Sequence, residues 1–572
     1  MKRLASVLLV VLIVLVSLWM LRGSRDPGGS GRDIELVATL RSEPRSLNRL
    51  LAGDRASLVV SQLIHEPLLR VNHVTQAIEP ALAASWTTLD DGRRVRLSLR
   101  SGVRFSDGSA ITADDVVFSL ATAYDARLAS PLTDSLTVNG LRIIARAVDA
   151  QTVDLTYPVA YGPGVRPLHG LPILPRARYA SRAADATLAA AWVPTAPPAD
   201  MVGAGPFVLD RHEPGVAVHL ARNPHYWRVA DDGTRLPRAD RLRLDIVPSQ
   251  DAEMLRLRAG DVDAITAELR ADDLPEARTL AAEGRLQLFE LGPSLEADML
   301  WFNLRPPQSP NAGPGTSEDR REWLRRRELR EAISHAVDRT SFINAVYRGA
   351  AVQVSGMITP GNHTWHASDI APRPFSLAMA AEQLDRIGVR DRNGDGVRED
   401  VYNVPATFTL LVQQGHTVRQ RAAVVLQEAL ARVGMKVEIA SLDARGLQER
   451  MATGAYDAIY HALPGSDTDP SGLMEFWLSS GRFHLWNPGQ PTPATRWEEE
   501  LDRLMSRQLS TTDLSERQRT VRQAQKVLDE HLPVIVFAVP RVTIATSARL
   551  THVSPGLLAP QVLWNAAEIG VR

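Results

Sequence analysis

The sequence predicts an α/β protein built from several domains. Stretches of alternating apolar and polar residues, typical of strands, recur between stretches whose apolar residues follow a helical period. Helices that alternate with strands along a chain are typical of α/β architecture. The chain has 572 residues, too many for a single core, and its length suggests roughly three domains.

Composition and charge narrow the classes of function. Hydrophobic residues make up 44% of the chain and charged residues 23%, as in ordinary globular proteins. The net charge is −1 and the arginines are scattered, so we expect no nucleic-acid partner. The sequence contains no cysteine, which excludes disulfides, zinc–thiolate sites, cysteine catalysis and a lipid anchor on cysteine.

The N-terminus has the features of an export signal. Met1-Lys2-Arg3 precedes an uncharged run at 4–21. As a helix, these residues would reach about 27 Å, close to the ~30 Å thickness of a bilayer core. We therefore expect residues 1–32 to be either a signal peptide or an inner-membrane anchor with a tether, and the remaining chain to be exported. Both alternatives stay open.

The stretch 94–120 predicts a strand, a turn and a capped helix. Apolar residues alternate with polar ones over 94–100, and Asp107-Gly108 supplies the turn. Thr112 is the expected N-cap of the helix, with Asp115 in the capping-box position three residues later. These residues predict structure and carry no catalytic chemistry.

The other elements follow from the same two periods. We expect a first strand at 34–39, a helix at 58–69 and a helix-like apolar run at 79–86. A helix at 252–258 should turn Leu255 inward. Further strands are expected on both sides of a turn at 149–151 and at 242–247, 436–439 and 532–537, and further helices at 329–337, 418–433 and 514–531.

Several blocks of the sequence resemble one known family. The strings LRSGVRFSDG and ITADDVVFS stand two residues apart at 99–119, and EPALAASW, GAGPF…NPHYW, RAGDVDA, LREAISHAVDR and GAYD occur elsewhere in the chain. Together they resemble the bacterial extracellular solute-binding proteins of family 5, which are the oligopeptide-, dipeptide- and nickel-binding receptors of ABC importers. The resemblance spans roughly residues 34–570.

The resemblance implies a two-lobed periplasmic-binding-protein clamshell of class II type with an additional third domain. Lobe I would combine residues 33–60, 195–300 and 546–572, lobe II would be 61–194, and lobe III would be 301–545. It also implies a periplasmic monomer that captures a peptide or similar solute and delivers it to an ABC permease in the inner membrane, without covalent chemistry.

Two other functions stay open beside this one. A membrane-anchored sensor would bind its ligand and signal without import, and a retained anchor would favour it. An exported hydrolase would need an unrecognised site, because the sequence has no Gly-x-Ser-x-Gly, no His-Glu-x-x-His and no Walker loop. We therefore expect no enzyme activity.

The candidate ligand-binding residues centre on the segment 462–470. In peptide receptors of the family, an aspartate four residues before the proline pairs with the ammonium of the peptide; Ser466 has that position here, and Asp467 and Asp469 lie beside it. Capping of the following helix is the alternative role for the two aspartates. The predicted set also contains Glu43, Asn303 and three aromatic residues that could instead be core: Trp365, Trp477 and Trp486.

The segment 391–402 resembles the start of a calcium loop. Asp391, Asn393 and Asp395 stand at positions 1, 3 and 5, a glycine follows at position 6, and Glu399 stands at position 9. Tyr402 replaces the bidentate glutamate at position 12. The segment is therefore either a calcium site or a turn held by side-chain hydrogen bonds, and no other cofactor is expected.

Overall fold

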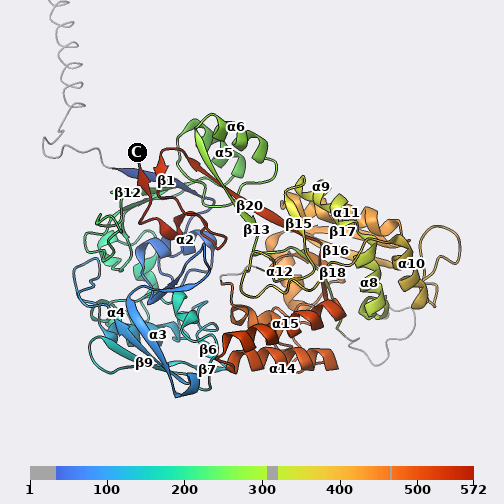
Figure 1. The fold of residues 1–572 in the computed structure, drawn as a ribbon, viewed down its shortest axis with the longest axis horizontal. Coiled ribbons are helices and arrows are strands. Elements are labelled where there is room, and N and C mark those ends of the chain that lie inside the picture. Colours follow the sequence, from blue (N-terminus) through green and yellow to red (C-terminus); the bar gives the residue numbers. More distant parts are fainter. Residues whose placement is uncertain (1–33, 306–319, 464–466) are drawn as a thin grey trace, which may run out of the picture. The chain divides into compact units, whose positions relative to one another are not determined.

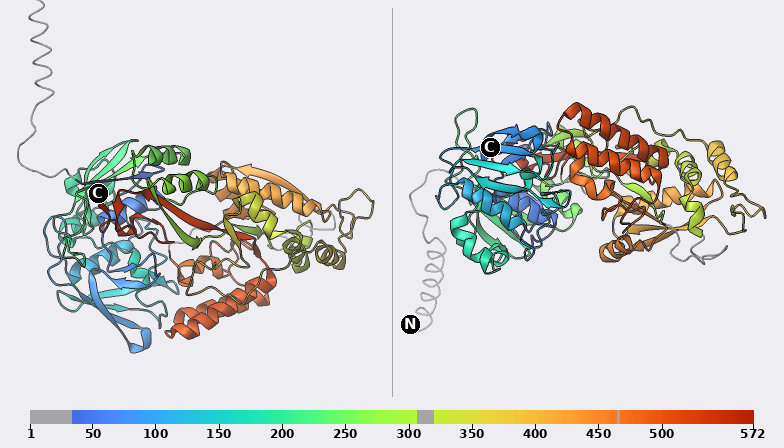
Figure 2. Two further views of the ribbon diagram at one scale, coloured as in Figure 1. Left: turned by 45° about the horizontal axis from the view of Figure 1, so that its top comes forward. Right: turned by 90° about the horizontal axis from the view of Figure 1, so that it is seen from below.

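The computed structural model describes residues 34–305, 320–463 and 467–572 (Figures 1 and 2). The predicted anchor or signal at 1–32 lies outside these residues. Within the described chain, no helix has the length and apolar character needed to cross a membrane.

The first sheet joins the start of the described chain to its middle. Its order is β1-β12-β11-β10, formed by Glu35–Leu40, Arg241–Ile246, Ala217–Arg222 and Phe207–Glu213. β1 and β12 run parallel, and the other pairs are antiparallel. The helices associated with these strands are α2 (Arg55–Ile64), α5 (Gln250–Ala259) and α6 (Leu274–Ala282).

The second sheet lies within 83–156 and is antiparallel. Its order is β4-β5-β9-β8, formed by Ala83–Leu89, Arg94–Leu99, Thr152–Thr156 and Ile144–Ala147. After it come the 3₁₀ helix η2 (Arg166–Gly170), the helix α4 (Arg176–Ala184) and a second 3₁₀ helix, η3 (Ala189–Trp192). Helix α3 (Ala113–Ala123) has the predicted cap, because the Thr112 amide and hydroxyl both donate to Asp115 Oδ2, at 2.8 and 2.9 Å.

The third sheet forms the centre of the C-terminal half. Its order is β17-β16-β18-β14-β19, formed by Lys436–Leu442, Thr407–Gln413, Ala458–His461, Met299–Phe302 and Val534–Val536. Helices in this half are α8 (Arg327–Ala336), α9 (Arg339–Tyr347), α10 (Leu377–Arg386), α11 (Thr417–Ala431) and α12 (Ala444–Thr453). The long helices α14 (Arg496–Ser510) and α15 (Leu514–His531) lie side by side (Figure 1).

The buried cores divide the described chain into two bodies. The first body contains 35–293 and 541–572, and the second contains 297–539; no fully buried apolar residue belongs to the core clusters of both. The chain crosses between them twice, through 294–296 and at residue 540. Strand β20 (Ala538–Ser547) pairs with β13 (Leu286–Pro293) on one side and with β15 (Ala351–Gln353) on the other. The predicted lobe limits stay predictions.

Three local predictions were wrong. The run 79–86 is not helical: its residues enter β3 (Ile78–Pro80) and β4, because pairing with β5 outweighs the helix propensity of the alanines. Leu255 points outward, since α5 buries the face that carries Met254 and Leu257. Helix α2 ends at Ile64 instead of residue 69, because Pro67 disfavours helical backbone before it.

Candidate functional site

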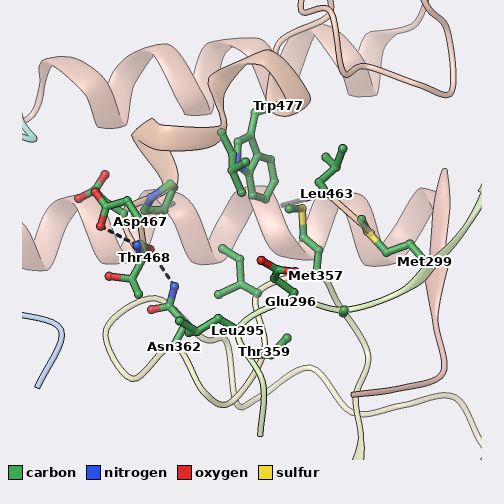
Figure 3. Close-up of a pocket in the computed structure, with 15 residues that line it drawn as sticks. Leu295, Glu296, Met299, Met357, Thr359, Asn362, Leu463, Asp467, Thr468 and Trp477 are labelled. Carbon is green, nitrogen blue, oxygen red and sulfur yellow. Dashed lines mark hydrogen bonds between the residues drawn. The ribbon is translucent and has the colours of Figure 1, made fainter. Parts of the chain in front are cut away.

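A small cavity lies where the chain crosses between the two bodies (Figure 3). The segment 295–299, the loop 357–362 and the segment 467–473 line it, together with Leu463 and Trp477, so its lining comes from the second body and the crossing segment. Its volume is about 50 Å³. Sites that hold drug-sized ligands measure about 300–1,000 Å³, so a peptide would need the surrounding segments to move apart.

Asp467 forms an ion pair that joins the two bodies. The Arg166 guanidinium, from η2 of the first body, donates to the Asp467 carboxylate at 2.6 to 2.8 Å and to Thr468 Oγ1 at 2.7 Å. The two side chains are 14% and 8% exposed. Burial raises the pKa of Asp467, but His169 and Arg166 outweigh burial and hold it below its usual value. Asp467 therefore stays ionised at neutral pH.

Asp469 forms a second ion pair, inside the second body. Arg517 of α15 donates to both carboxylate oxygens, at 2.8 and 3.1 Å, and both side chains are 4% exposed. Asp469 also accepts the Ser471 amide at 3.0 Å at the start of η5 (Pro470–Leu473). This is the capping role that the sequence left open. Both predicted cleft carboxylates are thus compensated by arginine.

Other contacts between the bodies lie near the Arg166–Asp467 pair. Gln76 Nε2 donates to the Gly361 carbonyl at 2.6 Å, and the Gly162 amide donates to the Leu509 carbonyl at 2.6 Å. At Gly162 a Cβ would stand 2.1 Å from the Thr511 carbonyl oxygen, so only glycine fits there. These contacts hold the two bodies together beside the Arg166–Asp467 pair.

The three predicted aromatic residues have different surroundings. Trp477 lines the cavity beside Leu463 and Met357 (Figure 3). Trp365 is 5% exposed, and the Arg517 guanidinium stacks 4.8 Å from its ring. Trp486 is fully buried, and its indole donates to Glu498 at 3.1 Å. Core packing, the alternative stated above, therefore describes Trp486 in this structure.

Two further predicted residues do not line the cavity. Asn303 is fully buried and donates to the carbonyls of Gly454 and Tyr456, at 2.8 and 3.0 Å, so it fixes the turn before β18. Glu43 accepts hydrogen bonds from His212 and from the Gly215 amide, both in the β10–β11 hairpin. Ser466 lies outside the described residues.

Sequence reasoning missed the partners that define the site. Arg166 stands 301 positions before Asp467, and Arg517 stands 48 positions after Asp469. Asn362, which donates to the Thr468 carbonyl at 2.7 Å, comes from a third segment. The sequence contained no local signal for any of these three, since each is one polar residue among many. The ligand-binding role of Asp467, Asp469 and the aromatic residues stays a prediction.

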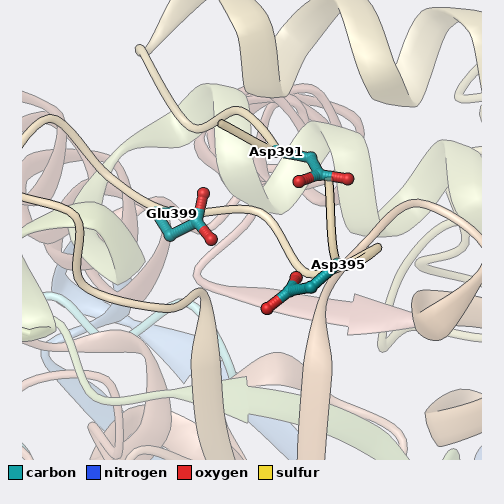
Figure 4. A group of neighbouring side chains, drawn as sticks. All are labelled: Asp391, Asp395 and Glu399. Atoms are coloured by element: carbon teal, nitrogen blue, oxygen red, sulfur yellow. The ribbon is translucent and has the colours of Figure 1, made fainter. Parts of the chain in front are cut away.

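The segment 391–402 brings three carboxylates together (Figure 4). Oxygens of Asp391, Asp395 and Glu399 lie within 4.8 Å of one another. Asp391 accepts the amides of residues 394 and 396, and Asp395 accepts the amide of residue 397, at 2.7 to 3.0 Å. Glu399 bridges to Arg390 and Pro405 in strand-like pairing, so no helix follows the loop. Both the calcium loop and the closed turn fit this geometry.

Comparisons with known proteins agree with this architecture. The family model described as bacterial extracellular solute-binding proteins, family 5 middle, matches residues 77–484. A probable ABC transporter-binding protein of Deinococcus radiodurans is 24% identical over 556 residues, which cover 92% of this chain and 90% of that protein.

Two solved structures have the same two-lobed fold. The ABC transporter substrate-binding protein CtaP of Listeria monocytogenes is 19% identical, with a TM-score of 0.77 over 94% of this chain and 100% of that one. The oligopeptide-binding protein AppA of Bacillus subtilis, in complex with a nonapeptide, is 21% identical, with a TM-score of 0.68 over 94% and 99%. This chain therefore belongs to the bacterial extracellular solute-binding proteins of family 5.

Proposed function

We propose that the protein captures a peptide or a similar solute outside the cytoplasm and delivers it to an ABC permease of the inner membrane. The observation that carries this proposal is the double crossing of the chain at 294–296 and residue 540, with the cavity and the Arg166–Asp467 pair beside it. Two bodies joined by two chain segments can open and close about the crossing.

Closure would serve as the signal to the permease. The cavity of about 50 Å³ is too small to admit a peptide. A solute would therefore enter the open form, contact both bodies and populate the closed form. The permease would bind the closed form with higher affinity, so loading and delivery need no covalent step.

The remaining properties follow from this role. We propose that the protein acts as a periplasmic monomer, without nucleic acid and without enzyme activity. Residues 1–32 would direct export as a cleaved signal or hold the protein at the membrane. N-terminal sequencing of the mature protein distinguishes the two, because cleavage removes Met1.

Native mass spectrometry of protein purified without refolding tests the proposal. We expect a co-purified, chemically unchanged solute, and a rise in melting temperature when the protein meets peptides of a broad panel. If no peptide of the panel shifts the melting temperature, peptides are not the solute. If the recovered molecule is a cleavage product, the protein is a hydrolase and the proposal fails.

A further inference from the structure

Three segments of the first body bring polar side chains together away from the cavity. They are the loop after β1, which carries Asn48 and Arg49, the end of α2 at His65, and the end of η3 at Trp192. The Leu47 amide donates to the Trp192 carbonyl at 2.9 Å. The His65 and Trp192 ring centroids stand 4.6 Å apart. The three segments are therefore in contact.

Buried polar atoms of this cluster have no hydrogen-bond partner among the described residues. They are Asn48 Nδ2 and Trp192 Nε1, on residues that are fully buried. The Leu50 amide donates to Asn48 Oδ1 at 2.9 Å, which leaves the amide nitrogen as the free end. Unpartnered buried donors are rare in proteins and need a specific explanation.

Arg49 adds a positive charge to these donors. Its side chain is partly buried, and within the described chain no carboxylate, carbonyl or hydroxyl pairs with its guanidinium. Burial lowers the pKa of Arg49 to about 10, which leaves it protonated at neutral pH. The buried Arg330 and Arg517 contrast with it, because each donates to several oxygens.

The cluster lies a short distance from the contacts between the bodies. Helix η2 begins with Arg166, which binds Asp467, and ends with Gly170. A Cβ at Gly170 would stand 3.7 Å from Arg49 Nη2. A 3₁₀ helix rises about 2 Å per residue, so Gly170, beside Arg49, lies about 8 Å along η2 from Arg166. An extended solute of a few residues could span that distance.

We infer that Asn48, Arg49 and Trp192 form a site that receives a carboxylate of the bound solute, an inference that rests on the proposed function. The free groups are N–H donors around one cation, which complements a planar monoanion with several acceptor lone pairs. His65, whose pKa burial lowers to about 3, is neutral and adds no second charge, so a dianion fits less well. Asp467 and Asp469 are compensated, so neither repels an anionic solute.

Two variants of the full chain test this site by melting temperature and titration calorimetry. Arg49→Gln removes the cation, and Arg45→Gln is the matched control, because Arg45 is an exposed arginine of the same loop. The probes are acetate, the tripeptide Ala-Ala-Ala and its C-terminal amide. Without any probe, we expect Arg49→Gln to melt no lower than wild type, since it loses an unpaired, partly buried charge.

We expect acetate to stabilise wild type and Arg45→Gln but not Arg49→Gln. Ala-Ala-Ala should bind Arg49→Gln at least tenfold more weakly, while its amide should bind all three proteins alike. Acetate should compete with the tripeptide. Two outcomes would overturn the site and show a structural or water-filled cluster instead. One is an equal response of all three proteins to acetate, and the other is a melting temperature of Arg49→Gln, without any probe, below those of wild type and Arg45→Gln.

Two results separate this inference from the proposed function. If acetate and the tripeptide bind independently, the site takes a free anion and the assignment to the solute is wrong. If acetate binds through Arg49 while neither peptide binds any variant, the carboxylate site stands and peptides fail as the solute.

Discussion

The Arg166–Asp467 pair should control the equilibrium between the open and closed forms. Asp467→Asn removes the negative charge while keeping the size of the side chain. The pair has three contacts of 2.6 to 2.8 Å between side chains that are 14% and 8% exposed. A charge-assisted interaction of this kind contributes about 1.5–3 kcal/mol, which corresponds to about a 10- to 150-fold change in an equilibrium constant.

This free energy should act on opening and not on unfolding. When a buried ion pair inside one core is broken, the remaining charge stays buried, and the loss reaches about 3–5 kcal/mol of stability. Arg166 instead regains water as soon as the two bodies separate. We therefore expect Asp467→Asn to populate the open form and to leave the melting temperature of each body nearly unchanged.

Förster transfer between labels on the two bodies measures this equilibrium. The chain has no cysteine, so Ser101→Cys and Ser506→Cys, both at exposed serines, give two specific attachment points. Transfer efficiency should fall in Asp467→Asn and at high salt concentration. Because the pKa of Asp467 is held below its usual value, the wild-type signal should persist above pH 4 and fall only as the pH drops through that lowered pKa.

Asp469→Asn is the matched control. Asp469 pairs with Arg517 inside the second body, at 4% exposure for both side chains. Its loss should lower the melting temperature without changing the transfer efficiency. The reasoning fails if both variants melt early with unchanged transfer, because the Arg166 pair would then belong to one rigid core.

Three further perturbations have defined outcomes. Gly162→Ala should shift the labels toward the open form, because its Cβ would stand 2.1 Å from a carbonyl oxygen of the second body, whereas Gly53→Ala, with no atom within 4 Å, should not. As the pH is lowered from 6 to 4, the free energy of unfolding of wild type, measured with urea, should fall by up to about 1.4 kcal/mol per pH unit. In this range His65 binds a proton only in the unfolded chain, because its pKa is about 3 in the folded protein, and His65→Gln should remove this component. Millimolar Ca²⁺ should leave the melting temperature unchanged, since Tyr402 stands where the calcium loop needs its bidentate ligand; a rise that Asp395→Ala abolishes would instead establish the calcium site.

Local signals in the sequence predicted the elements whose structure depends on neighbouring residues. The cap of α3 formed as expected at Thr112 and Asp115, because both partners lie three positions apart. Helix α15 has the expected bounds, 514–531. Strand β4 was mistaken for a helical run, since its alanines favour a helix until β5 pairs with them. That pairing depends on residues beyond the local window.

The candidate site depends even more on residues that are far apart in the sequence. The sequence identified Asp467 and Asp469, because they stand in a segment with a recognisable pattern, but it could not identify the groups that neutralise them. A free carboxylate would attract an ammonium, whereas one bonded to Arg166 or Arg517 carries little net charge toward a solute. We therefore expect these two arginines to set the charge that Asp467 and Asp469 present to a solute.

For the same reason, Arg49 can be identified only from the folded structure. The sequence contains many arginines, and the folded chain gives most partly buried ones an acidic or carbonyl partner. Arg49 lacks such a partner in the described chain and lies among unpartnered N–H groups. A receptor whose two carboxylates are compensated, and whose Arg49 receives an anion as we infer, should prefer an anionic end of its solute to an ammonium. Comparing a peptide with its amide therefore tests the charge preference of the whole cleft.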